Sequence, residues 1–157
     1  MVTYTVLKTL HILSMVLLFG TGLGTAWFMW RADRTRQAVV IFVTARHVVW
    51  ADYLFTLPSI LIQPLSGLWL TELAGFPPGG KWLLVTYILY AIAGACWIPV
   101  VWLQIRMRNL AETALRDGTE LPPQFHKANR AWLALGVPAF AVAALTVWVM
   151  VSKTTPW

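Results

Sequence analysis

Four long apolar stretches limit what this chain can fold into. They cover residues 5–30, 50–72, 82–103 and 131–151, and each reaches the length of about 20 apolar residues that a hydrocarbon layer of ~30 Å requires. Tryptophans stand near many of their ends, as in an interfacial aromatic belt: Trp30, Trp50, Trp82, Trp102 and Trp132. We therefore predict an all-α, four-helix transmembrane bundle that forms a single membrane domain over residues 1–157.

Composition excludes a soluble globular domain. The 157 residues are 59% hydrophobic and 11% charged, whereas about a quarter of the residues of a soluble domain are charged. The net charge of +6 comes from basic residues in short segments beside the apolar stretches, which is typical of a protein embedded in a lipid bilayer and does not indicate nucleic-acid binding. The single cysteine, Cys96, excludes a disulfide framework and a thiolate metal cluster.

The basic residues predict the orientation of the bundle. Most arginines lie in residues 31–49 and 104–130, whereas the segment 73–81 holds only Lys81. By the positive-inside rule the two arginine-rich segments are cytoplasmic, so both termini lie on the outer, periplasmic side of a multi-pass inner-membrane protein. The first apolar run continues past Trp27 to Arg31 without a small-residue cleavage site, so we interpret it as a true span and not as a signal peptide.

Three segments between the spans have their own predictions. Residues 38–44 are apolar but too short to cross a bilayer, so they form either an interfacial helix or an inward extension of the second span. The segment AGFPPGGK is rich in proline and glycine and predicts a tight turn that ends both flanking helices. Residues 108–116 are predicted to continue the third helix beyond the membrane.

The second span carries residues that a lipid-facing helix cannot accommodate. Asp52, Pro58, Gln63 and Pro64 all lie within it, and a buried carboxylate or amide needs a partner, as does each carbonyl that a proline leaves unpaired. This helix is therefore predicted to face other helices. Gln63 is expected either to bridge helices or to contact a bound ring.

Asp52 lies about one turn inside the inner edge of the second span. One interpretation is a structural ion pair with an arginine at the same interface, the candidates being Arg46, Arg106, Arg108 and Arg130. The other is a proton-handling carboxylate that serves a redox site. Gln104 and Arg106 are interpreted as interface residues at the inner end of the third span.

His11 is the most informative single residue for a cofactor. At a rise of ~1.5 Å per residue from Thr5, it lies about 9 Å inside the hydrocarbon layer. An imidazole at that depth must hydrogen-bond to a neighbour or bind a metal, and in helical bundles it recurs as an axial haem ligand. Both interpretations stay open: His11 as the metal ligand of a b-type haem, or His11 in a hydrogen bond between helices.

No second histidine lies at the level of His11. His47 and His126 fall at the inner ends of their helices, ~20 Å or more from His11 along the membrane normal, so they cannot bind the same iron. The polar groups closer to the level of His11 are Gln63, Ser66, Tyr87, Tyr90 and Thr146. A separate inner-side polar cluster of His47, Asp52, Arg108 and His126 is a further candidate site, and the alternative is that these histidines are solvated at the interface.

The first span also contains Gly20-x-Gly22-x-Gly24. This pattern includes one pair of small residues four positions apart, which favours close contact between membrane helices. We therefore favour a packing role for these glycines over a cofactor role.

Several strings resemble a known family. LKTLHILSMVLLFGTGLGTAWF, ADYLFTLPSILIQPLSGLWL, CWIPVVWLQIRMRNLA and LGVPAF are similar to the bacterial family of predicted integral membrane proteins of unknown function. The patterns Asp-x-Leu-Phe-Thr-x-Pro and Gln-Pro-Leu-x-Gly recur in that family. The resemblance covers nearly the whole chain and implies four transmembrane helices without a settled activity.

The first helix also resembles, more distantly, two families that bind cofactors or metals. One is the flavin-independent membrane protoporphyrinogen oxidase and the other is the CopD-type family of copper-resistance proteins; both have a Leu-His pair near the start of an apolar helix. The oxidase resemblance implies haem binding through His11. The copper resemblance has less support because the methionines are scattered in depth: Met15, Met29, Met107 and Met150.

Two functions from different classes follow. The first is a b-type haem protein with a redox role, in which His11 binds the iron and Gln63 lines the cofactor. Its electron partner would be a quinone, a porphyrinogen or a membrane redox protein. The alternative is a non-catalytic membrane subunit or assembly factor whose intramembrane polar residues are structural. Self-association is compatible with both functions.

Overall fold

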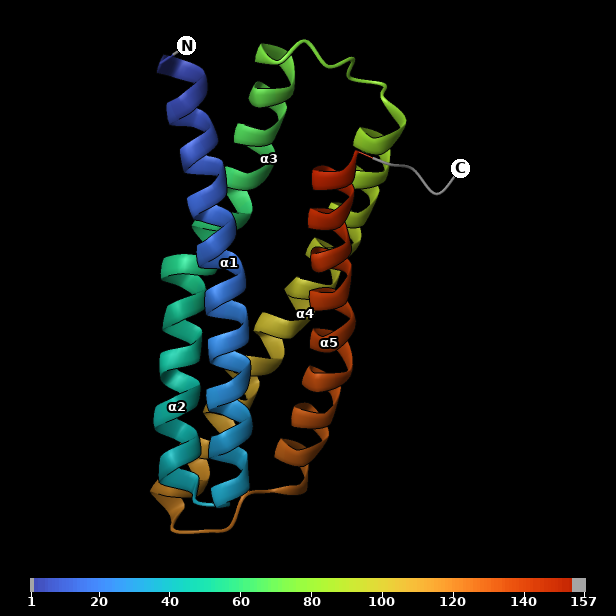
Figure 1. Cartoon of the computed structure of the whole chain (residues 1–157). Helices are drawn as coiled ribbons and strands as arrows, with labels where there is room; N and C mark the ends of the chain where they lie inside the picture. The colour runs from blue at the N-terminus through green and yellow to red at the C-terminus, as the bar shows by residue number, and fades with distance from the viewer. Residues whose placement is uncertain (1, 154–157) are drawn as a thin grey trace.

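The computed structural model describes residues 2–153, and these form one α-helical arrangement (Figure 1). The elements in chain order are α1 (Val2–Thr35), α2 (Ala38–Ala51), the π-helical turn η1 (Asp52–Thr56), α3 (Leu57–Leu73), α4 (Lys81–Asp117) and α5 (Pro123–Ser152). No strand occurs among the described residues. The prediction of an all-α fold is confirmed.

Four helices within the described chain are long and apolar enough to cross a membrane. They cover Val2–Thr35, Ala38–Leu73, Lys81–Asp117 and Pro123–Ser152. Each is longer than the apolar stretch predicted from the sequence, because the helices continue into the basic segments. The continuation of the third helix through residues 108–116 is confirmed, since α4 ends only at Asp117.

The second membrane helix is one continuous path through α2, η1 and α3. Residues 38–44 belong to α2, where Ile41 is completely buried, so the inward extension is the correct alternative. The helix widens at η1, where the N–H of Leu57 reaches back to the carbonyl of Asp52. Pro58 follows at once and has no N–H for the carbonyl four residues earlier, which accounts for a wider turn at this point.

The bundle has a compact half and an open half. In the compact half, α2 packs between α1 and α4 and α5 packs on α4, around a core centred on Met29, Ile41, Met107 and Phe125. In the open half, α1 pairs with α3 and α4 pairs with α5. A hydrogen bond joins the two pairs, from the Tyr90 hydroxyl on α4 to the backbone carbonyl of Ile60 on α3 at 2.5 Å. Figure 1 shows the two pairs separating toward the end at which the described chain begins and ends.

The connection between α3 and α4 ends both helices, as predicted, but it is a longer segment than a tight turn: residues 74–80 cross the gap between the two helices (Figure 1). Gly75 adopts a left-handed backbone conformation with φ of 70°, which glycine reaches at little steric cost. The N–H of Gly75 donates to the carbonyl of Glu72, and the N–H of Gly80 donates to that of Pro77. These bonds end α3 and begin α4 within a few residues.

The arginine-rich segments both lie at the compact end, and the described ends of the chain lie at the opposite end with the α3–α4 connection (Figure 1). Arg34 lies over the ring of Trp30 at 4.8 Å, and Arg106 lies over Trp102 at 5.3 Å. Such pairs suit a membrane interface, and the interface assignment of Arg106 agrees with its exposure. That the compact end faces the cytoplasm stays a prediction.

Candidate functional site

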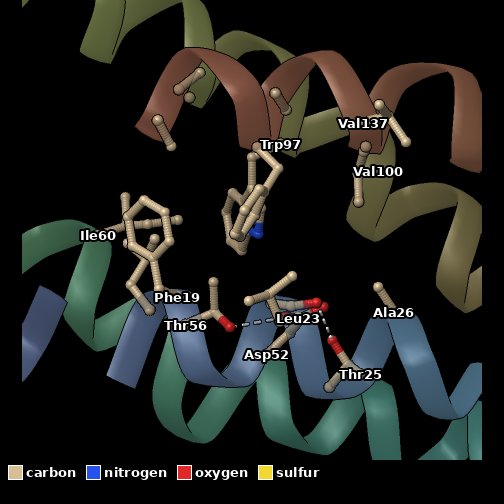
Figure 2. Close-up of a pocket in the computed structure, with 18 of the residues that line it drawn as sticks. Phe19, Leu23, Thr25, Ala26, Asp52, Thr56, Ile60, Trp97, Val100 and Val137 are labelled. Atoms are coloured by element: carbon tan, nitrogen blue, oxygen red, sulfur yellow. Dashed lines mark hydrogen bonds between the residues drawn. The ribbon is translucent and has the colours of Figure 1, made fainter. Parts of the chain in front are cut away.

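A cavity of about 330 Å³ lies between α1, the η1–α3 segment, α4 and α5. Its wall is mainly apolar and includes Met15, Leu18, Phe19, Trp97 and Phe140. Figure 2 shows Phe19, Ile60 and Trp97 extending from different helices into the same space. The ring of Phe19 meets that of Phe140 edge to face, with centroids 5.0 Å apart, so the contact links α1 to α5.

Glycines keep this cavity open. Gly22, Gly94 and Gly136 line it from three helices, and a Cβ atom added at any of them would meet no atom within 4 Å. The same holds for Gly20 and Gly24. The predicted close helix contact at Gly20-x-Gly22-x-Gly24 is therefore wrong: Gly22 lines the cavity, and Gly20 and Gly24, on another face of α1, have no neighbouring atom close to them.

Polar residues form a stripe along η1 and α3, on one side of the cavity. Its members are spaced by four and three residues in turn, so they share one helix face, and all are buried: Asp52, Thr56, Ser59, Gln63 and Ser66. This face is directed toward the bundle interior, which confirms the prediction for the second span. Three of its members, Asp52, Thr56 and Gln63, also line the cavity.

Gln63 joins α3 to α1. Its Nε2 donates to the backbone carbonyl of His11 at 2.7 Å and to Oγ of Ser14 at 2.6 Å, while the Ser14 hydroxyl donates to the same carbonyl at 2.9 Å. Of the two predicted roles of Gln63, bridging helices is the one that the structure displays. The bonds lie in a buried setting, where each is electrostatically stronger than in water.

The imidazole of His11 is held by Ser66. Nδ1 of His11 lies 2.8 Å from Oγ of Ser66, and the Ser66 hydroxyl donates to the carbonyl of Ile62 at 2.5 Å. A serine hydroxyl has one proton, so Ser66 accepts from His11 and Nδ1 carries the hydrogen. Nε2 is then the unprotonated nitrogen, and the backbone of Gln63 also contacts the imidazole. The predicted hydrogen bond between helices is confirmed.

The missing side chain of Gly67 leaves room for the His11 ring against α3. A Cβ atom at Gly67 would lie 3.3 Å from Cε1 and 3.8 Å from Nδ1 of His11, so the imidazole packs directly on the backbone of α3. His11 itself is not among the residues that line the cavity. The ring is thus part of the α1–α3 contact, beside the cavity wall and outside it.

Three buried polar atoms at the inner end of the cavity lack partners in the described chain. They are Oδ2 of Asp52, Oε1 of Gln104 and Nε1 of Trp132, from η1, α4 and α5, and all three residues line the cavity. Each residue is at most 5% exposed. A buried polar group without a partner costs about 1–3 kcal/mol, so three of them around one space indicate a site that something else completes.

Asp52 does not form the ion pair that was one of its two predicted roles. Its Oδ1 accepts from the Thr56 hydroxyl at 2.8 Å (Figure 2), Gln104 approaches the same carboxyl, and no salt bridge involving Asp52 occurs among the described residues. The ion pair is wrong because the side chain points into the bundle, away from the interfacial arginines. Gln104 is likewise buried at 4% exposure and is not an interface residue.

The other members of the predicted inner-side polar cluster make contacts with residues other than Asp52. His47 is exposed, Arg108 donates to the side chain of Asn109, and the ring of His126 packs edge to face on Phe125 at 5.6 Å. None of these contacts involves Asp52. Within residues 2–153, no group of three or more His, Cys, Asp or Glu side chains is arranged to hold a metal ion.

Sequence reasoning missed Ser14, Gly67 and Trp132. Ser14 is an inconspicuous residue of an apolar span, although it lies one helical turn from His11 and so shares its face. Gly67 belongs to the Gln-Pro-Leu-x-Gly string, and that string was the available signal. Trp132 looked like one of the interfacial tryptophans, and its burial depends on where α5 meets the core.

Neither a curated protein nor a solved structure matches this chain. The more distant resemblances of the first helix to the protoporphyrinogen oxidase and CopD-type families therefore have no support from these comparisons. A family match does exist, and it extends over residues 5–154, which includes every residue of the cavity wall and of the polar stripe. The chain belongs to the family described as predicted integral membrane protein, DUF2269.

Proposed function

We propose that this protein binds an amphipathic small molecule inside the membrane, in the cavity between the two helix pairs. One observation carries the proposal: an apolar cavity is lined by three residues, Asp52, Gln104 and Trp132, that each have one buried polar atom without a partner in the described chain. Ligand sites are typically apolar hollows with a few convergent polar groups. The apolar wall would hold a hydrocarbon or ring body, and the polar end would hold a head group.

The dimensions support a small ligand. The volume of about 330 Å³ lies at the lower end of the ~300–1,000 Å³ range of ligand pockets. Phe19, Trp97 and Phe140 supply ring faces and edges against which a planar or isoprenoid body can pack. Gly22, Gly94 and Gly136 add to the free space, because each leaves a side-chain volume empty.

Gly22→Leu tests the proposal by filling the cavity. Gly22 lines the cavity and has nothing within 4 Å of its Cβ position, so a leucine occupies free space and should not prevent folding. Protein purified from membranes is extracted with solvent, and bound small molecules are identified and quantified by mass spectrometry. We expect wild type to retain a molecule at near one per chain and Gly22→Leu to retain at most a tenth of that amount.

Gly20→Leu is the matched control. Gly20 is exposed, lies two residues away on the same helix and does not line the cavity. This variant should retain the molecule as wild type does. Equal retention by both variants would mean that the molecule binds elsewhere, and absence of any retained molecule from wild type would also contradict the proposal.

A second candidate function is b-type haem binding with a redox role. It is favoured by the state of His11, whose Nδ1–H is fixed by Ser66 and whose Nε2 carries a lone pair, as in histidines that ligate metals through Nε2. His11 could supply one axial ligand, although its ring lies beside the cavity and does not line it. A bound haem would supply one-electron chemistry, with a quinone, a porphyrinogen or a membrane protein as the electron partner.

The contacts of His11 and Gln63 fit the structural alternative equally well. Both side chains join α1 to α3, as expected of a non-catalytic subunit or assembly factor held together by polar contacts between helices. A spectrum separates the two possibilities, because only the first requires a chromophore.

His11→Ala is the test of the haem candidate. A reduced-minus-oxidised absorbance spectrum of the purified wild-type protein should show a b-type band at a haem-to-protein ratio near one, and His11→Ala should lose it. Ser66→Ala is the comparison, since it removes the Nδ1 partner but keeps the ligating nitrogen, and it should retain the band in a weakened or shifted form. A wild-type protein that stays colourless after haem supplementation would eliminate this candidate.

A further inference from the structure

We propose that the inner end of the cavity recognises a hydroxyl group, so that the ligand is a neutral, lipid-soluble alcohol or phenol. The inference rests on the proposed ligand-binding function and names the chemical class of the ligand. It is carried by the three atoms without partners, Oδ2 of Asp52, Oε1 of Gln104 and Nε1 of Trp132, which come from three different elements.

The three atoms differ in what they require. Nε1 of Trp132 carries a hydrogen and can only donate, and Oε1 of Gln104 can only accept. Oδ2 of Asp52 accepts when the carboxyl is ionised and carries or shares a proton when it is not. A partner for this set must therefore both accept and donate. A hydroxyl does so with one atom, since its oxygen accepts from the indole while its hydrogen goes to the carboxyl or the amide oxygen.

Other head groups satisfy the set less well. A carboxylate or phosphate would place its charge beside Asp52 and Gln104, whose free atoms are oxygens. An ammonium group has three hydrogens and no lone pair, so it would leave the indole N–H of Trp132 without a partner. A ketone or quinone carbonyl accepts from Trp132 but has no hydrogen for Gln104. The hydroxyl is the simplest group that completes both kinds of atom.

Two sources of this chemistry occur in membranes. A quinol has a phenolic hydroxyl on a ring, and an isoprenoid alcohol has a terminal hydroxyl on a flexible chain. Both combine one hydroxyl with an apolar body that the aromatic wall of Phe19, Trp97 and Phe140 can contact. The shared requirement is the hydroxyl, and matched probes distinguish the two bodies.

The experiment measures binding of two pairs of probes to the full-length protein in lipid nanodiscs. The pairs are decylubiquinol with its dimethyl ether, and farnesol with farnesyl methyl ether. Methylation keeps the apolar body and removes the hydrogen that the hydroxyl donates. We expect one alcohol to bind about tenfold more tightly than its ether, a factor typical of one hydrogen bond.

Trp132→Phe tests whether the ligand oxygen binds at the indole of Trp132. It keeps an aromatic side chain and removes the indole N–H, so it should weaken binding of the alcohol about tenfold, and binding of the ether as well, because the ether oxygen can still accept from the indole. Trp102→Phe is the control on a tryptophan that is 56% exposed and lies outside the cavity. It should change neither affinity. Unchanged thermal unfolding of both variants shows that the difference is one of binding.

Each outcome has a defined meaning. A preference for decylubiquinol over its ether supports a quinol, and a preference for farnesol supports an isoprenoid alcohol. Equal affinity of alcohols and ethers overturns the hydroxyl proposal, as does a Trp132→Phe variant that binds the alcohol as tightly as wild type does. Those results leave cavity binding intact, because cavity binding is tested separately by Gly22→Leu.

Discussion

Replacing Gln63 by glutamate is expected to lower the free energy of unfolding by about 3–5 kcal/mol, the range for a buried charge left without a partner. Gln63 is 4% exposed, and its Nε2 donates to the carbonyl of His11 and to Ser14. An ionised glutamate has no hydrogen to donate and places an oxygen against the carbonyl oxygen of His11. The contact between α1 and α3 then becomes repulsive within the membrane.

The loss should depend on pH. A glutamic acid that binds a proton can again donate one hydrogen bond to the carbonyl of His11, so the variant should be less destabilised at pH 5 than at pH 8. The measurement is unfolding in detergent followed by circular dichroism at both pH values. Gln124→Glu makes the same chemical change at an exposed position in the first turn of α5 and should shift stability by less than about 0.5 kcal/mol. A Gln63→Glu protein as stable as wild type at pH 8 would contradict the bridging role.

Gly67→Leu is expected to destabilise the protein by about 1–3 kcal/mol, the usual effect of overpacking. A Cβ atom at this position already lies 3.3 Å from Cε1 of His11, and the further leucine carbons would occupy the space of the imidazole. The ring must then leave Ser66, which breaks the bond between Nδ1 and Oγ. Thermal unfolding of the purified protein measures the effect.

Gly67→Ala and Gly20→Leu are the comparison variants for Gly67→Leu. Alanine adds only the Cβ atom, so a displacement of His11 by a few tenths of an ångström relieves the contact and the loss should be smaller. Gly20→Leu adds the same leucine where nothing lies within 4 Å and should be neutral or slightly stabilising, since glycine is a poor helix former. If Gly67→Leu unfolds at the wild-type temperature, His11 does not pack on α3 as described.

The sequence predicts the fold well because membrane physics leaves few alternatives. Spans of about 20 apolar residues, the polar residues of the second span and the Pro-Gly turn after Leu73 lead to the four helices that the structure contains. The level of His11, Gln63 and Ser66 could also be predicted, because each residue advances a helix by ~1.5 Å. Those three residues do meet.

Contacts between helices were less predictable. Depth places Asp52 near several arginines, but the direction of its side chain follows from the phase of the helix at η1, and it faces Gln104 and Thr56 instead. The spacing of Gly20 and Gly24 suits close packing, yet no atom lies within 4 Å of a Cβ atom placed at either position. The cavity exists only through the joint geometry of four helices, which no local pattern encodes.

The separation of the α1–α3 pair from the α4–α5 pair also affects the unit in which the concentration of a ligand should be expressed for this protein. Under the proposed ligand-binding function, a site between membrane helices that is partly open to its surroundings would exchange its contents with the bilayer. Occupancy then follows the mole fraction of the ligand among the lipids. An affinity quoted in aqueous molarity would change with the amount of lipid or detergent present, even if every contact in the cavity stayed the same.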